Sequence, residues 1–344
     1  MHSYVVQDVL FTIEDSEGLL SSTDSRILGA FPSLDWSCGF VTKMEMRIAP
    51  KSTANSDSDC PPRVWSGKVD GYRITNYRER SRRRVEVGDD GLVDFDTEEG
   101  WAFFQFPESP NPYVRSYLLM QVIADSLCTG GRCFVHAACL ASPGHDRLSG
   151  GTLIVAPSHT GKTTTALALA KSGWRLLTDD MSYVRPARLG IGVWGFPRAC
   201  HIRPGTLKLA SWLNELSLGT PDYEKVRSLP IDSLGPNGWV NAPWLPPELI
   251  VILEPHNTRG SIIEPIDCAQ SLCLLSSESV NALSGVCDQD APKEFQTLAE
   301  LVQSAPSCRL SVGPDLDCVG DQLNVFINEH LPAFRRKRSV GRAA

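Results

Sequence analysis

The residues best suited to chemistry lie between a short apolar run and an Ala/Leu-rich helical pattern, in the segment Ala156-Pro157-Ser158-His159-Thr160-Gly161-Lys162-Thr163. A loop that joins a strand to a helix in this way points its backbone N–H groups, together with the helix N-terminus, at an anion. Lys162 would contact the β- and γ-phosphates of a nucleotide, and the Thr163 hydroxyl would bind Mg²⁺. The pattern predicts a P-loop (Walker A motif). Its expected ATP contacts are Ser158, His159, Thr160, Gly161, Lys162, Thr163 and Thr164.

The match to the motif G-x-x-x-x-G-K-[S/T] has one departure, because Ala156 stands at the first glycine position. A small residue fits there when its φ stays negative. The alternative interpretation is a strand, a turn and a helix that carry Thr-Gly-Lys-Thr at their corner by chance. The flanking pattern and an acidic pair downstream favour the P-loop.

That acidic pair is Asp179-Asp180, directly after the short apolar segment Arg175–Thr178. Two adjacent carboxylates can bind Mg²⁺ or accept a proton from an attacking hydroxyl. An isolated Asp-Asp pair is more typical of a turn or a helix cap. This one follows Lys162 by 17 and 18 residues, and the intervening helix would return the chain to the phosphate site.

Two further groups are candidates. His136 lies on an apolar strand pattern, Cys133–Ala141, where a single histidine is more typical of a satisfied core residue. Arg198, His201 and Arg203 follow the acidic pair, and an arginine near a transferring phosphate neutralises charge in the transition state. The alternative for these three is a surface loop with scattered charge, and Arg198 is the preferred site residue.

Together, these segments resemble the HPr kinase family, whose P-loop domain is related to phosphoenolpyruvate carboxykinase. The matching residues are Val135-His136-Ala137-Ala138-Cys139-Leu140, then Ser158 to Thr164, then Gly173-Trp174-Arg175-Leu176-Leu177-Thr178-Asp179-Asp180. The resemblance covers residues 113–186 well and the later part of the chain only in outline.

The resemblance implies a role for each matched residue and the use of ATP and Mg²⁺. Lys162 would bind the phosphates, and Thr163 and Asp180 would hold the metal. Asp179 would be the base that takes the proton of the acceptor hydroxyl, although the sequence does not decide which of the two aspartates does so. His136 would lie beside the metal and the γ-phosphate.

Departures from the family pattern limit what is carried over. His159 stands where the family usually has glycine, and the C-terminal signature that serves phosphorolysis is not found, so a reverse reaction is not expected. The N-terminal part is similar to the β-rich leader of short HPr-kinase-related proteins, including those that phosphorylate lasso peptide precursors. That similarity rests on Trp65-x-Gly67, Asp70-Gly71 and the segment from Leu118 to His136.

The chain pattern predicts an α/β (α+β) fold with a P-loop core and a β-rich N-terminal part. We expect three regions: 1–112, a β-rich region; 113–330, the nucleotide-binding kinase core; and 331–344, a basic disordered tail. The basic cluster Arg78–Arg84 fits either a solvated strand or turn face or a contact for an acidic peptide or phosphate. The expected elements are strands at 5–10, 40–48, 72–77, 133–141, 151–156, 175–178, 249–253, 261–266 and 309–312, and helices at 113–129, 163–171, 293–304 and 321–330.

Composition narrows the function classes. The 344 residues are 42% hydrophobic and 21% charged, which excludes disorder or coiled coil throughout the chain. A net charge of −7 argues against a globally basic nucleic-acid surface. No signal peptide or membrane span is recognisable, and the 11 cysteines include no C-x-x-C, so a cytoplasmic protein with reduced thiols and no structural metal site is expected.

The predicted function is transfer of the γ-phosphoryl group of ATP to a hydroxyl, with serine of a peptide or protein, such as a small precursor peptide, as the preferred acceptor. Three alternatives stay open: a carboxykinase-like enzyme, a kinase for a small-molecule hydroxyl, and an ATP-binding regulator without catalysis. ATP and the acceptor are the expected partners. No nucleic-acid or membrane partner is expected, and self-association is undecided.

Overall fold

The computed structural model describes residues 2–6, 9–15, 42–50, 60–69, 71–129, 131–143, 150–187, 190–219, 225–242, 244–255, 260–282, 291–313 and 316–341. These residues form two compact units, which divide between Arg132 and Cys133. The sequence interpretation starts its second region at residue 113, twenty residues earlier. The difference arises because the helix after residue 111 packs on the sheet of the first unit.

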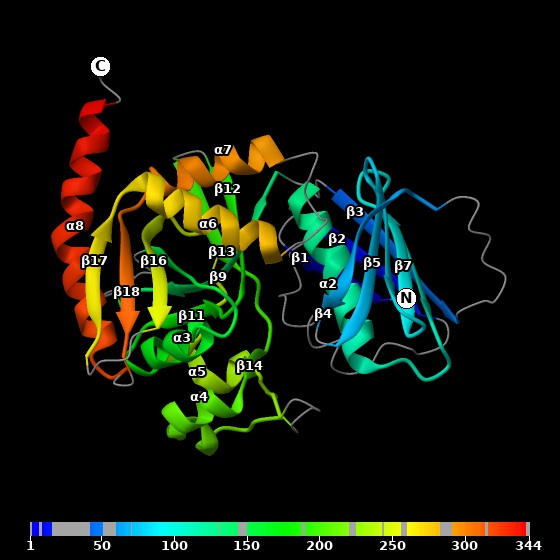
Figure 1. The fold of residues 1–344 in the computed structure, drawn as a ribbon, viewed down its shortest axis with the longest axis horizontal. Helices are drawn as coiled ribbons and strands as arrows, with labels where there is room; N and C mark the ends of the chain where they lie inside the picture. Colours follow the sequence, from blue (N-terminus) through cyan, green and yellow to red (C-terminus); the bar gives the residue numbers. More distant parts are fainter. Residues whose placement is uncertain are drawn as a thin grey trace. The chain divides into compact units, whose positions relative to one another are not determined.

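The first unit contains an eight-stranded sheet in the order β1-β2-β3-β8-β7-β6-β5-β4 (Figure 1). The β2–β3 and β3–β8 pairs are parallel, and the other neighbours are antiparallel. A single strand over 5–10 was wrong, because Val5 pairs with Leu10 across two strands. The bounds are β1 His2–Val6, β2 Val9–Asp15, β3 Thr42–Pro50, β4 Arg63–Val69, β5 Tyr72–Glu79, β6 Arg82–Val87, β7 Gly91–Asp96 and β8 Trp101–Phe106.

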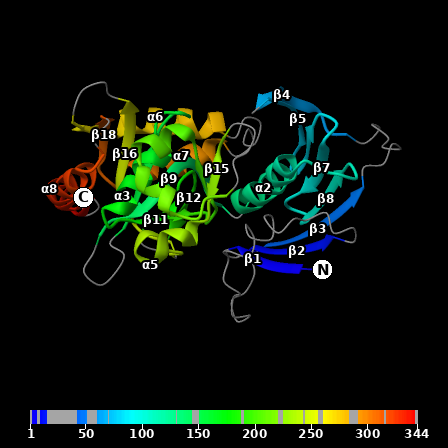
Figure 2. The ribbon, with the colours of Figure 1, turned by 90° about the horizontal axis from the view of Figure 1, so that it is seen from below.

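Helix α2 (Pro112–Thr129) packs on this sheet over β7 and β8, and Figure 2 shows it lying along the strands. Side chains on a strand alternate between its two faces. Val93, Phe95 and Phe104 are therefore buried on the helix side, together with Leu118 and Val122 of α2. The apolar spacing of 113–129 predicted this helix to within one residue.

The basic cluster Arg78–Arg84 differs from both interpretations at three of its arginines, which are paired within the unit, whereas Arg80 lies exposed in a turn. Arg83 is buried, forms an ion pair with Asp125 of α2, and stacks on Phe95. Arg84 donates two hydrogen bonds to Asp94, at 2.7 and 3.2 Å, and Arg82 pairs with the same carboxylate at 3.4 Å. The cluster therefore helps to hold the first unit together.

The second unit is built on a mixed sheet in the order β13-β12-β9-β10-β16-β18-β17, with β11 also paired to β9. Strands β10, β16 and β18 run parallel, and β9 and β17 flank them antiparallel. The bounds are β9 Cys133–Ala141, β10 Gly151–Val155, β11 Arg175–Thr178, β12 Met181–Ala187, β13 Gly190–Gly195, β16 Pro247–Pro255, β17 Ile262–Ile266 and β18 Ser307–Val312.

Helices cover both faces of this sheet (Figure 1). Helices α3 (Lys162–Lys171) and α8 (Val319–Gly341) pack on one face with Leu140, Val251 and other residues of alternate strand positions. Helices α6 (Cys268–Ala282) and α7 (Ala291–Val302) pack on the other face with the intervening positions, such as Cys139 and Ile250. This layered unit and the strand-rich first unit confirm the predicted α/β class.

Two helices differ from expectation. The sequence interpretation has no helix at α6, where buried Ser271 and Ser279 interrupt the apolar period that predicts one. Helix α8 continues through Gly341, into the segment expected to be a disordered tail. The arginines and lysine of that segment are good helix formers, which favours continuation of the helix. None of the described helices is long and apolar enough to cross a bilayer.

Between β13 and β16 the chain forms short elements near α3, and their only described strand pair is the antiparallel pair β14–β15. Phe196, Ile202, Leu213 and Leu229 are fully buried and anchor this segment. Its described elements are β14 Cys200–Ile202, α4 Pro204–Leu209, η2 Ser211–Glu215, β15 Arg227–Leu229, η3 Ile231–Leu234 and α5 Gly235–Gly238.

Candidate active site

The predicted phosphate loop joins the end of β10 to the start of α3. Gly161 at the N-cap of α3 has a φ of 108°, a conformation that side chains other than glycine rarely adopt. His159 has a φ of 68° and an exposed side chain. Helix α3 then begins at Lys162, with the N–H of Thr165 donating to the Gly161 carbonyl at 2.9 Å. The loop thus places the free N–H groups of a helix start at the edge of the sheet.

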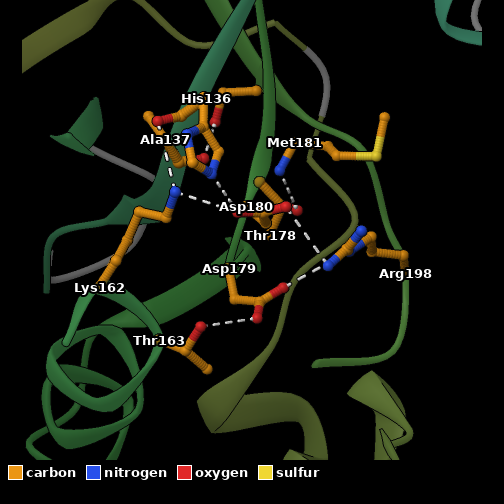
Figure 3. Close-up of polar contacts among 10 residues, drawn as sticks. His136, Ala137, Lys162, Thr163, Thr178, Asp179, Asp180, Met181 and Arg198 are labelled. Atoms are coloured by element: carbon orange, nitrogen blue, oxygen red, sulfur yellow. Dashed lines mark hydrogen bonds and ion pairs between the residues drawn. The ribbon is translucent and has the colours of Figure 1, made fainter. Parts of the chain in front are cut away.

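Lys162 is buried, although it carries a charged group. Its Nζ lies 3.0 Å from Oδ1 of Asp180 and donates a hydrogen bond to the carbonyl of His136 at 3.5 Å (Figure 3). Burial lowers the pKa of Lys162, and Asp180 opposes that shift. A buried ammonium beside a helix N-terminus forms a strong site for an anion.

His136 faces the side of the sheet on which α3 lies. Its strand neighbours Val135 and Ala137 belong to the core on the opposite face, so alternation turns His136 toward the loop. Nε2 of His136 lies 2.9 Å from Oδ1 of Asp180. The pairing of Met181 with His136 across β12 and β9 accounts for this contact, because Asp180 directly precedes Met181. His136 therefore belongs to the polar cluster and not to the apolar core.

The two aspartates point to different partners (Figure 3). Asp179 is 1% exposed, and its Oδ2 accepts a hydrogen bond from Thr163 Oγ1 at 3.0 Å. Asp180 instead faces Lys162, His136 and Arg198. Burial raises the pKa of Asp180, but Arg198, the hydrogen bond from His136 and Lys162 outweigh it, so the pKa lies well below its ordinary value.

Arg198 spans both carboxylates. Its Nε lies 3.7 Å from Oδ1 of Asp179, and its Nη2 lies 3.4 Å from Oδ2 of Asp180. Burial lowers the pKa of Arg198, but the two carboxylates outweigh it and the net shift is upward. A hydrogen bond of 2.8 Å from the Phe196 N–H to the Met181 carbonyl holds this stretch beside the acidic pair. The other basic candidates, His201 and Arg203, are exposed.

Thr164, which the sequence counted among the ATP contacts, has a buried hydroxyl that lies 2.8 Å from the hydroxyl of Thr206 on α4. This contact ties the first turn of α3 to the segment that carries Arg198. Ser158 and His159 are exposed, and Thr160 and Gly161 are half-buried.

Two residues near the cluster were not singled out from the sequence. Thr206 is one, and Cys200 is the other. Cys200 is fully buried beside Asp179; burial and then the Asp179 carboxylate raise its pKa well above the ordinary value. The one available signal was the position of Cys200, two residues after the candidate Arg198.

The residues around Thr163 and Asp179 fit a magnesium ion. Oδ1 of Asp179 is buried and has no hydrogen-bond partner among the described residues; it faces Nε of Arg198 at 3.7 Å, too far for a hydrogen bond, so its lone pairs are available to a metal ion. In the described part of the chain, no group of three or more His, Cys, Asp or Glu side chains could hold a metal by itself. That agrees with Mg²⁺, which takes few protein oxygens and completes its shell with water and phosphate.

Comparisons with known proteins find distant likenesses among solved structures alone. No known family matches the sequence, and no curated protein matches it. Among solved structures, the HPr(Ser) kinase/phosphatase from Coxiella burnetii is similar over 61% of this chain and 96% of its own. The identity is 13% and the TM-score is 0.32. Both values are low, so function is inferred from the residues of the site.

Proposed function

We propose that the protein is an ATP-dependent phosphotransferase that moves the γ-phosphoryl group to a hydroxyl, with serine of a peptide or protein as the acceptor. One observation carries the proposal. Lys162 at the start of α3, His136 of β9 and Arg198 meet at a single carboxylate, Asp180, beside a helix N-terminus. Elements far apart in sequence thus bring cations and carboxylates together where an anion binds well.

Binding of ATP would redirect these cations. The loop N–H groups and Lys162 would hold the β- and γ-phosphates, and Arg198 would face the phosphoryl group in transfer. Phosphoryl transfer needs mainly positioning and stabilisation of charge spread over the phosphoryl oxygens. A planar guanidinium suits that task because it donates several hydrogen bonds from a fixed fork.

The contact between Thr163 and Asp179 favours a different division of the carboxylates from the one that the family resemblance implies. Thr163 and Asp179 would hold Mg²⁺, as the P-loop hydroxyl and an acidic residue do in other P-loop enzymes. When bound, the ion would neutralise charge on the phosphates. Asp180 would then be the group that orients the acceptor.

Asp180 would accept the hydrogen bond of the acceptor hydroxyl once Lys162 and Arg198 turn to the phosphates. The hydroxyl oxygen forms a bond to the γ-phosphorus while the bond to the β-phosphate oxygen breaks and ADP leaves. The hydroxyl proton passes to Asp180 and then to water. Before ATP binds, Arg198, the hydrogen bond from His136 and Lys162 hold the pKa of this carboxylate well below its ordinary value, so it is ionised near neutral pH.

Transfer of labelled phosphate from ATP to peptides with internal or C-terminal serine tests the proposal. Lys162→Ala should abolish transfer. Lys171→Ala is the matched control, since Lys171 lies on the same helix with an exposed side chain. ATP binding without transfer to any acceptor would support a regulator instead. Release of CO₂ from oxaloacetate would support a carboxykinase.

A further inference from the structure

Positive charge is concentrated at one edge of the first unit. Eight of the 33 lysines and arginines fall between Arg63 and Arg84, where the acidic residues are Asp70 and Glu79. The chain as a whole has a net charge of −7, so this stretch stands out from the rest. Arg82, Arg83 and Arg84 are paired inside the unit, as described above. The exposed members of the stretch need a separate explanation.

Three of these exposed residues, Arg63, Lys68 and Arg73, lie on one face of the β4–β5 hairpin, and we call them the edge cations. Lys68 and Arg73 are directly opposite each other in the strand register, and Arg63 is opposite Tyr77. All three side chains are exposed, and none has an acidic partner among the described residues. Like charges directly opposite on two strands are destabilising, so an anion bound between them would relieve repulsion.

Strand β4 is also the last strand of its sheet, since its only described neighbour is β5 (Figure 2). An edge strand offers unpaired N–H and C=O groups to another extended chain. Val64 on this edge is 45% exposed. On the opposite face, a side chain at Gly67 would clash with the ring of Trp65, so the indole already covers that position. Among the described residues, nothing pairs with the edge of β4 or forms an ion pair with the edge cations.

We infer that β4 and the edge cations bind an acidic, extended segment of the acceptor peptide, which adds to the sheet as a further strand. Backbone pairing along β4 would supply affinity, and carboxylates on one face of the added strand would meet Lys68 and Arg73. A peptide fits better than nucleic acid, because Glu79 and Glu86 lie on the same face and would repel a continuous polyanion. This inference rests on the proposed function in one respect only, which is that the phosphate acceptor is taken as the source of the bound segment.

Binding is tested without catalysis, by fluorescence anisotropy of a labelled ten-residue peptide that alternates glutamate with valine or threonine. The full-length Lys162→Ala variant should bind it as the wild type does, so failure of the kinase proposal would not affect this test. Lys68→Glu/Arg73→Glu should weaken binding by roughly tenfold or more, since two attractions become repulsions. Lys171→Glu/Lys293→Glu makes the same change in net charge at exposed sites elsewhere and should leave the affinity unchanged.

Two altered probes separate charge from strand pairing. N-methylation of alternate residues on one side of the peptide should weaken binding, and methylation of the other set should not, because only one side of an added strand pairs with β4. Equal binding of both methylated peptides would overturn the strand model. Equal loss in both charge-reversal variants, or tighter binding of a single-stranded oligonucleotide at the same edge, would overturn the assignment to a peptide.

Discussion

Both units bring arginine and aspartate together, but they use the charges differently. In the first unit Arg83 meets one carboxylate, Asp125, and burial raises the pKa of Asp125 even against that partner. In the second unit Asp180 meets Lys162, His136 and Arg198, and these outweigh burial and lower its pKa. The comparison shows that pairing alone does not distinguish a structural cluster from a functional one. Two arginines also share Asp94 in the first unit. The candidate site differs in that Asp180 contacts groups from three separate parts of the chain, beside the start of a helix.

The largest expected effect separates the two clusters by activity. Asp180→Asn and Asp179→Asn should each lower phosphoryl transfer by about a thousandfold, because each removes a charge that acts on the reacting groups. Added Mg²⁺ should partly restore Asp179→Asn and not Asp180→Asn, if the division of roles is correct. Asp94→Asn, in the first unit, should leave turnover per folded molecule unchanged. Equal losses of phosphoryl transfer in Asp94→Asn and Asp180→Asn would contradict the difference between the two clusters.

The second effect concerns stability. Arg83→Met should cost about 3–5 kcal/mol of the free energy of unfolding, because it removes the ion-pair partner of the buried Asp125 carboxylate. Urea denaturation followed by circular dichroism measures this loss. The double variant Arg83→Met/Asp125→Leu should recover most of it, since a well-packed apolar pair can replace a buried ion pair. Arg82→Met, at a half-exposed position, should cost about 1 kcal/mol or less.

Arg198→Lys tests whether the forked geometry matters in the second cluster. Lysine keeps the charge but presents a single point donor, so it would not span Asp179 and Asp180 together. We expect turnover to fall by roughly tenfold to a hundredfold while ATP affinity changes little. Steady-state kinetics with ATP titration measure both quantities. Unchanged turnover would show that Arg198 serves the fold of the cluster instead.

The smallest effect is expected at the contact between α3 and α4. Thr206→Val removes a hydroxyl from the buried pair with Thr164 and should cost about 1–2 kcal/mol of stability. If this contact also keeps Arg198 positioned beside Asp179 and Asp180, the turnover of Thr206→Val should fall while its KM for ATP stays constant. Thr206→Ser should restore both values. A loss of stability without any change in turnover would confine Thr206 to a structural role.

Local patterns explain why much of the second unit was predictable. The apolar run before residue 156, the Thr-Gly-Lys-Thr corner and the Ala/Leu spacing after it are contiguous, and β10 and α3 lie where they indicate. Helix α6 lacked such a pattern, since its buried positions include serines. A period can be recognised only where burial and apolar character coincide.

Contacts between residues that are distant in the sequence were harder to predict from the sequence. Nothing in Arg78–Arg84 indicates that Arg83 meets Asp125, which lies 42 residues further along the chain. Likewise, the adjacency of Asp179 and Asp180 does not reveal that they face different partners. Consecutive residues near a strand end point to opposite sides, so small changes in register decide which carboxylate meets Thr163.

By itself, the sequence determined the α/β class, the strand–loop–helix at Gly161-Lys162 and the short spacing that returns Asp179 and Asp180 to it, because these depend on local periodicity and glycine conformation. Only the tertiary structure decided that His136 and Arg198 meet Asp180 and that Thr163 meets Asp179. It also decided that Arg82, Arg83 and Arg84 form ion pairs within the first unit. Those contacts depend on strand register and on helix docking between distant segments, where a shift of one residue would turn each side chain to the other face.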